Sequence, residues 1–108
     1  MRTKINDVHV TLASRYQSML HNVASIENIP DELNADNLRW MSERIIAKSQ
    51  DMPDDKVGRW IGWIQAGCVL RGLTTSRVER EFSRALFHAA YAAEGLPIPE
   101  TADRETDQ

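Results

Sequence analysis

The stretch from Arg59 to Leu73, RWIGWIQAGCVLRGL, constrains the fold of this chain more than any other segment. It holds two tryptophans, three glycines and the only cysteine. Five residues recur at helical spacing and predict one apolar face: Val57, Trp60, Ile61, Ile64 and Cys68. Because other apolar residues lie well round the cylinder, we expect this helix to be the most buried one of a helical domain.

Small residues form a second pattern on the same segment, since Gly58, Gly62 and Ala66 follow one another at four-residue steps. A glycine inside a helix costs about 1 kcal/mol relative to alanine. A compensating gain is therefore expected, and the close approach of a neighbouring helix backbone is the obvious one. The stripe predicts tight helix packing along residues 58–66.

Four segments in all show helical periodicity, and none shows the alternation of a strand. The predicted helices cover residues 5–24, 35–49, 54–72 and 77–94. Their ends carry recognisable signals: capping residues at 34–36, acids at Asp54 and Asp55, a capping box from Ser76 to Glu79, and glycines at 72 and 95. The sequence predicts an all-α, single-domain bundle of about four helices over residues 1–99, followed by a disordered acidic tail at 100–108.

The first and fourth predicted helices each have an expected core face. In the first helix this face comprises Ile5, Val8, Leu12, Tyr16, Met19, Leu20 and Val23. In the fourth helix the expected inward residues are Val78, Phe82, Ala85, Leu86, Ala89 and Ala93.

Charge and composition exclude several classes of function. The chain has 108 residues and a net charge of −3, all of which comes from the residues after Pro99. A neutral body gives no general attraction to nucleic acid or to anionic membranes. The chain shows no secretory signal and no apolar run long enough to span a bilayer. The single cysteine suits a buried, reduced thiol, so we expect a cytoplasmic protein.

The sequence carries no recognisable catalytic or metal-binding motif. His21 is expected at the surface, while His9 lies at the edge of the first apolar face and His88 belongs to the fourth helix. None has a carboxylate or thiol at metal-ligand spacing. We therefore expect no cofactor, no metal and no enzyme. Only a convergence of His9, His88 and carboxylates from separate helices would favour catalysis.

A strip on the fourth helix is the leading candidate for a partner-binding surface. It comprises Arg80, Arg84, Phe87, His88 and Tyr91, on the side opposite the expected core face. Arginine and aromatic residues are enriched at the centres of protein interfaces. Alternatively, the first helix or the segment LPIP covers Phe87 and Tyr91.

Trp40 and Trp63 are secondary candidates for partner binding. Trp40 projects nearly opposite the apolar face of the second helix, and Trp63 lies well round the third. Trp40 is either buried by a loop or exposed as part of a partner surface.

Two further interpretations of the sequence remain open. The third and fourth predicted helices fit the spacing of a helix-turn-helix through Cys68, Gly72 and Val78. Thr75, Ser76 and Arg77 would then lead into a major groove. Glu79 and Glu81 count against this reading because they would approach phosphates. A homodimer is the other reading, in which the glycine stripe packs against its own symmetry mate.

Two segments, DKVGRWIGWIQAGCVLRGL (55–73) and EREFSRALFHAAYAAEGLPIP (79–99), are similar to small uncharacterised proteins of tailed phages and prophages. The similarity covers residues 38–99, beginning at LRWMSERI, and transfers no functional residue. It implies the cytoplasm of a bacterium and an accessory role. With the interface-like residues, it favours a non-enzymatic protein–protein interaction module that modulates a host protein, such as defence or recombination machinery. A small helix-turn-helix-like DNA-binding regulator is the alternative.

Overall fold

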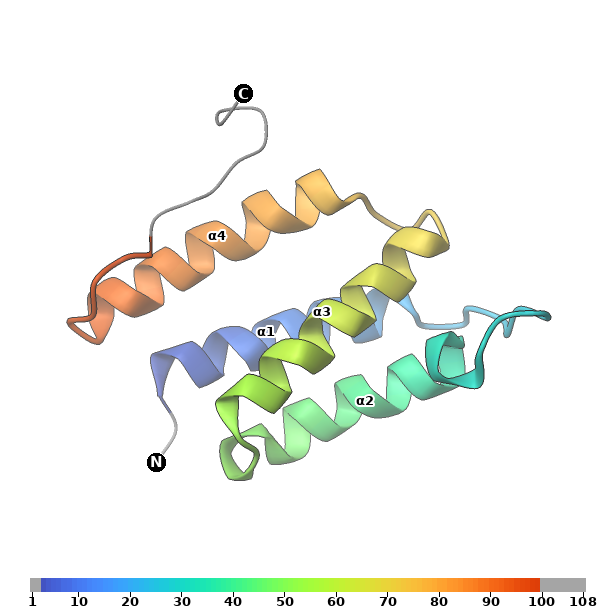
Figure 1. Cartoon of the computed structure of the whole chain (residues 1–108), viewed down its shortest axis with the longest axis horizontal. Helices are drawn as coiled ribbons and strands as arrows, with labels where there is room; N and C mark the ends of the chain where they lie inside the picture. Colours follow the sequence, from blue (N-terminus) through green and yellow to red (C-terminus); the bar gives the residue numbers. More distant parts are fainter. Residues whose placement is uncertain (1–2, 100–108) are drawn as a thin grey trace.

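A computed structural model describes residues 3–99, which fold into four α-helices (Figure 1). The helices are α1 (Lys4–Met19), α2 (Ala35–Lys48), α3 (Asp54–Leu70) and α4 (Ser76–Ala93), with short 3-10 helices η1 (Asp31–Leu33) and η2 (Ser49–Asp51) on either side of α2. Within this range there is no strand. The all-α prediction is confirmed, while the predicted disordered tail, 100–108, lies outside the described residues.

Side-chain caps define where three of the helices begin. Thr3 accepts a hydrogen bond from the Asn6 backbone N–H, Asn34 accepts one from Ala35, and Thr75 accepts one from Val78. Each cap satisfies a backbone donor that the first helical turn leaves without a partner. The predicted capping box at Ser76 is wrong, because Thr75 is the cap and Glu79 turns into the core.

Glycines end α3 and α4 in the same way. Gly72 and Gly95 both have positive φ, at 72° and 70°. Beyond each glycine a backbone N–H reaches back five residues: Leu73 donates to the Cys68 carbonyl and Leu96 to the Tyr91 carbonyl. This is the Schellman motif, in which a left-handed residue lets the chain satisfy the last carbonyls of a helix. The predicted glycine ends are confirmed.

The first helix is shorter than predicted. It ends at Met19 rather than near residue 24, and Asn22 adopts a left-handed conformation with φ of 62°. Asparagine tolerates this conformation better than most residues, so it can end a helix as glycine does. Val23 therefore lies beyond the helix, in the segment that leads to α2.

The core lies around α1, which packs against all three other helices (Figure 1). Its buried apolar side chains come mainly from α1, α2 and α3: Val8, Leu12, Ala13, Tyr16, Leu20, Leu38, Met41, Ile45, Val57, Ile61, Ile64, Cys68 and Ala90. The prediction that the third helix is the most buried is wrong, because α3 exposes one long side that includes Arg59, Trp63 and Leu70.

The glycine stripe on that exposed side does not bring helices together. Gly58 and Gly62 face solvent, and a Cβ added at either would meet nothing within 4 Å. The close approach occurs at Gly67, where an added Cβ would lie 2.3 Å from Cδ1 of the buried Leu38. Tight packing between α2 and α3 therefore depends on a glycine of the opposite face.

The orientation of α4 also differs from the prediction. Val78 is 47% exposed and Ala85 and Ala89 face solvent, whereas Glu79 and Ala90 are buried. Relative to the predicted orientation, α4 is rotated about its own axis by about 100°, which is the angle between successive residues of an α-helix. Phe87 thereby comes to pack against the core, which places part of the predicted outer strip on the inner side.

Glu79 is fully buried and forms an ion pair with Arg15 of α1. The guanidinium donates to both carboxylate oxygens, over 2.8 and 2.9 Å, and the Thr74 hydroxyl donates to the second oxygen over 2.6 Å. These hydrogen bonds, that from Arg15 above all, lower the pKa of Glu79 against the opposing effect of burial. Arg15 also lies 4.0 Å above the Phe82 ring. This contact fastens the start of α4 to the middle of α1.

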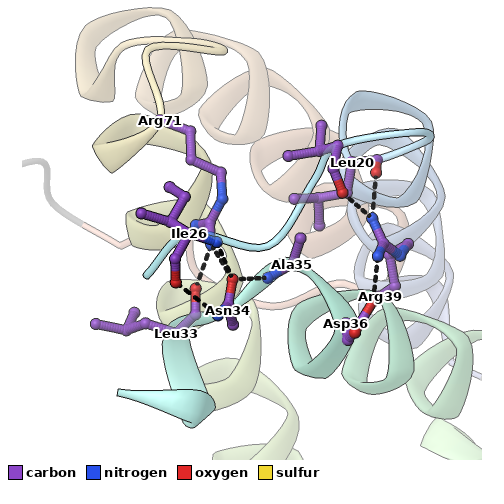
Figure 2. Close-up of polar contacts among 9 residues, drawn as sticks. Leu20, Ile26, Leu33, Asn34, Ala35, Asp36, Arg39 and Arg71 are labelled. Carbon is purple, nitrogen blue, oxygen red and sulfur yellow. Dashed lines mark hydrogen bonds and ion pairs between the residues drawn. The ribbon is translucent and has the colours of Figure 1, made fainter. Parts of the chain in front are cut away.

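Two arginines anchor the segment between α1 and α2 (Figure 2). Arg39 donates to the backbone carbonyls of Leu20 and Val23, over 2.8 and 2.9 Å, and pairs with Asp36. Arg71 donates over 2.7 Å to the carbonyl of Leu33. The arginines thus supply donors to carbonyls that have no helical partner.

Cys68 is fully buried in α3, and burial raises the pKa of its thiol to about 11. A thiol with such a pKa is almost entirely protonated at neutral pH and reacts slowly. None of the helices in the described part of the chain is both long enough and apolar enough to cross a membrane.

Candidate functional site

The predicted strip on α4 is divided by the fold. Arg80 is exposed at the surface, whereas Arg84, Phe87, His88 and Tyr91 are half-buried and line one pocket. The ring of Phe87 meets the ring of His9 edge-on, with centroids 5.6 Å apart and an interplanar angle of 69°. Helix α1 therefore covers part of Phe87, in agreement with the alternative that the first helix covers this residue.

This pocket, called the α4 pocket below, has a volume of about 570 Å³. Three helices and the segment after α4 contribute to its wall. Its lining residues are Ile5 and His9 from α1, Asp54 and Asp55 from α3, Arg84, Phe87, His88 and Tyr91 from α4, and Pro99. Volumes between about 300 and 1,000 Å³ are typical of small-molecule sites.

His9 is the most buried polar residue of the α4 pocket, with 6% of its surface exposed. Its Nδ1 atom is buried and has no hydrogen-bond partner among the described residues. Burial lowers the pKa of His9, although the Asp54 carboxylate acts in the opposite direction. The imidazole is therefore neutral at pH 7 and carries an unsatisfied polar atom beside the pocket.

The α4 pocket contains charged groups of both signs. Asp54 and Asp55 lie in the first turn of α3, while Arg84 and His88 are one turn apart on α4. Within residues 3–99, no hydrogen bond or ion pair joins any of these four side chains to another residue. The pocket thus has an acidic side and a basic side that do not neutralise each other through direct contact.

The convergence of His9, His88 and two carboxylates is the arrangement that would favour catalysis. The lining residues nevertheless include no thiol and no serine or threonine hydroxyl, which are the commonest nucleophiles of covalent catalysis. Nowhere in residues 3–99 do three or more His, Cys, Asp or Glu side chains group in a way that could hold a metal ion. What the pocket offers directly is binding groups of opposite charge together with an apolar part of the lining.

Trp40 and Trp63 lie on a different face of the molecule, formed by α2 and α3. They are 52% and 41% exposed, so Trp40 is not covered by a loop. Trp60 lies between the two helices, with its ring centroid 5.8 Å from that of Trp40. The Trp63 indole N–H donates to the Glu32 carbonyl over 2.9 Å, which ties η1 to α3.

Together these side chains form a shallow hollow of about 420 Å³, called the tryptophan surface below. Its lining residues are Glu32, Asn37, Trp40, Met41, Arg59, Trp60 and Trp63. Two further cations lie over its rings: Arg44 is 6.0 Å from the centre of the Trp40 ring, and the Lys56 ammonium is 5.3 Å from that of Trp60. The surface is apolar at its centre and predominantly basic at its edge.

Several site residues were missed by sequence reasoning. Trp60 was assigned to the buried face of its helix, although it is half-buried and completes the tryptophan surface. The close spacing of Arg59, Trp60 and Trp63 in the sequence is the signal that could have indicated this surface. No local signal could join His9 to Asp54 and Asp55, because these residues come from separate helices.

The chain matches no protein-family model, no curated protein and no solved structure.

Proposed function

We propose that this protein is a non-enzymatic protein–protein interaction module that binds its partner through the tryptophan surface. The observation that carries the proposal is the exposure of Trp40 and Trp63 on one continuous apolar hollow. A large aromatic side chain left in water forgoes the free energy of burial, about 1.5–3 kcal/mol for a ring that becomes fully covered. Tryptophan and arginine are also the residues most enriched among those that dominate binding energy.

The charges around the hollow indicate the kind of partner. Arg44, Lys56 and Arg59 surround the rings, against the single carboxylate of Glu32 in the lining. A complementary segment would place an apolar side chain over the rings and acidic residues beside the three cations. We therefore propose an acidic, apolar-anchored segment of another protein as the occupant.

The similarity to small phage and prophage proteins suggests where this partner is found. We propose a bacterial or phage protein in the host cytoplasm, which the module modulates by covering part of its surface. Two observations make the helix-turn-helix alternative less suitable. Val78, which would seat the second helix on the first, is 47% exposed, and α4 packs mainly against α1 rather than α3.

The test starts from affinity purification out of bacterial lysate with three immobilised proteins. These are the wild type, the Trp40→Ala/Arg59→Ala variant of the tryptophan surface, and the Arg84→Ala/Tyr91→Ala variant of the α4 pocket. Circular dichroism first establishes that all three are folded. We expect the second protein to lose the captured partner and the third to keep it. Loss in the α4 variant alone would show that the partner surface is the predicted strip instead.

The captured partner is then purified and titrated into the wild-type protein. All three tryptophans of the chain line the tryptophan surface, so binding there should shift their emission. Affinity should fall as salt rises from 50 to 300 mM, because exposed charge pairs are screened. Binding without any change in emission would refute the proposed surface. A mobility-shift assay on duplex DNA at low salt should show no complex.

A further inference from the structure

The α4 pocket has the properties of a site for a small ligand, separate from the tryptophan surface. His9 is more than nine-tenths buried, forms part of the pocket wall, and has an Nδ1 atom without a partner. A buried polar atom left unsatisfied costs about 1–3 kcal/mol, and such atoms are rare in native structures. This wall of the pocket is therefore not optimised for stability alone.

The charges of the pocket restrict the chemistry of that ligand. Asp54 and Asp55 begin α3, where the helix dipole contributes roughly half a positive charge, so the two carboxylates leave this side acidic. On α4, Arg84 offers a planar guanidinium and His88 an imidazole. A ligand with a charge of one sign would meet a group of the same sign elsewhere in the lining. A ligand carrying both charges would complement both sides.

The pocket lining also has an apolar part. Ile5 and Phe87 pack against the protein core, and the Tyr91 ring lies beside them in the pocket lining. A volume of about 570 Å³ exceeds what a glycine-sized molecule fills and leaves space for a ring. An aromatic side chain on the ligand could pack against these rings edge-on or offset.

We propose that the α4 pocket binds a free α-amino acid with a large apolar or aromatic side chain. Its ammonium group lies against Asp54 and Asp55, and its carboxylate is bound by Arg84 with His88 beside it. The side chain packs on Ile5 and Phe87. This site is independent of the proposed partner surface, so either proposal can fail without the other.

The experiment uses the full chain and three related probes. L-phenylalanine carries both charges, phenethylamine only the ammonium group, and 3-phenylpropanoate only the carboxylate. Each is titrated into ¹⁵N-labelled protein, and backbone amide shifts are followed by NMR. We expect L-phenylalanine to shift amides of residues lining the pocket. Both single-charge probes should bind at least tenfold more weakly.

Variants assign each charge of the ligand to one side of the pocket. Arg84→Gln should weaken L-phenylalanine and 3-phenylpropanoate at least fivefold but should not weaken phenethylamine, whose ammonium group the guanidinium repels. Asp54→Asn/Asp55→Asn should weaken L-phenylalanine and phenethylamine but should not weaken 3-phenylpropanoate, whose carboxylate the two aspartates repel. Arg59→Gln, on the tryptophan surface, is the matched control and should leave all three affinities unchanged.

The measurements that test this site are distinct from those that test the proposed function. Because no tryptophan lines the α4 pocket, L-phenylalanine should bind without shifting tryptophan emission. Absence of shifts at 10 mM L-phenylalanine, equal binding of the three probes, or an Arg84→Gln variant that binds like the wild type would each overturn the proposal.

Discussion

The ion pair between Arg15 and Glu79 predicts that two similar substitutions will have very unequal effects. Arg15→Met removes the guanidinium and keeps the apolar stem, leaving the Glu79 carboxylate fully buried with the hydroxyls of Thr74 and Tyr16. Removing one partner of a buried pair typically costs about 3–5 kcal/mol. In Glu79→Gln the remaining charge belongs to Arg15, whose side chain is 28% exposed and can turn towards water. We expect a cost of about 1–2 kcal/mol for Glu79→Gln.

The pH dependence of the free energy of unfolding provides a second, independent test of this prediction. In the wild type the pKa of Glu79 is lowered, so the pair contributes stability above the unfolded-state pKa of about 4.3 and loses it as pH falls through the folded-state pKa. In Arg15→Met the guanidinium is gone and burial remains, so the pKa of Glu79 should rise. Protonation of Glu79 then costs the folded variant less than it costs the folded wild type, so the deficit of the variant relative to the wild type should shrink between pH 7 and pH 4.

The free energy of unfolding is measured by urea denaturation at both pH values, with circular dichroism at 222 nm as the signal. Single domains have only about 5–15 kcal/mol of stability, so Arg15→Met itself can be unfolded at pH 7. The double variant Arg15→Met/Glu79→Gln covers that case, because it leaves no buried charge and should be more stable than Arg15→Met alone. Equal costs for the two single variants, or a deficit that does not change with pH, would refute the reasoning.

Three further predictions concern packing, pH and the loop between α1 and α2. Gly67→Ala should destabilise the protein by about 1–3 kcal/mol, since its Cβ would meet the buried Leu38, whereas Gly62→Ala should stabilise it by about 0.5–1 kcal/mol; urea denaturation compares them, and the opposite ranking would contradict the structure. Burial lowers the pKa of His9, so the unfolded chain takes up the proton first and stability should fall between pH 7.5 and 5.5; thermal denaturation of His9→Gln should show a flatter dependence over that window. Arg39 binds the two carbonyls through Nη1 and Asp36 through Nη2, and the single ammonium nitrogen of Arg39→Lys cannot occupy both positions; this variant should cost about 1–2 kcal/mol and speed proteolysis within residues 20–34, and unchanged cleavage would argue against the anchoring role.

The helices and their ends were largely predictable because their signals are local. Periodic apolar residues give the helices, and Gly72 and Gly95 end α3 and α4 where a left-handed residue is needed. The orientation of α4 was not predictable in this way. Its alanines allow either of two faces to be buried, and the choice is made by Glu79, whose partner Arg15 is 64 residues away in the sequence.

The candidate sites also combine features with a local sequence signal and features that depend on tertiary contacts. The position of Trp40 opposite an apolar face left two alternatives, burial by a loop or exposure, and the structure shows that Trp40 is exposed. The close approach was predicted at the wrong glycines, because the four-residue spacing favours Gly58 and Gly62, whereas Leu38 of α2 meets Gly67 on the other face of α3. The α4 pocket likewise combines residues of three helices, and their meeting depends on the tertiary arrangement alone.

The inert thiol of Cys68 has a practical consequence for spectroscopy on this protein. Maleimide reagents modify thiolates, and a fully buried group with a pKa of about 11 offers hardly any at neutral pH. A cysteine introduced at an exposed position, such as Arg80 on α4, would therefore be labelled selectively without removing the native one. A dye attached there and the three indoles on α2 and α3 would form a donor–acceptor pair that reports on the distance between the two halves of the fold.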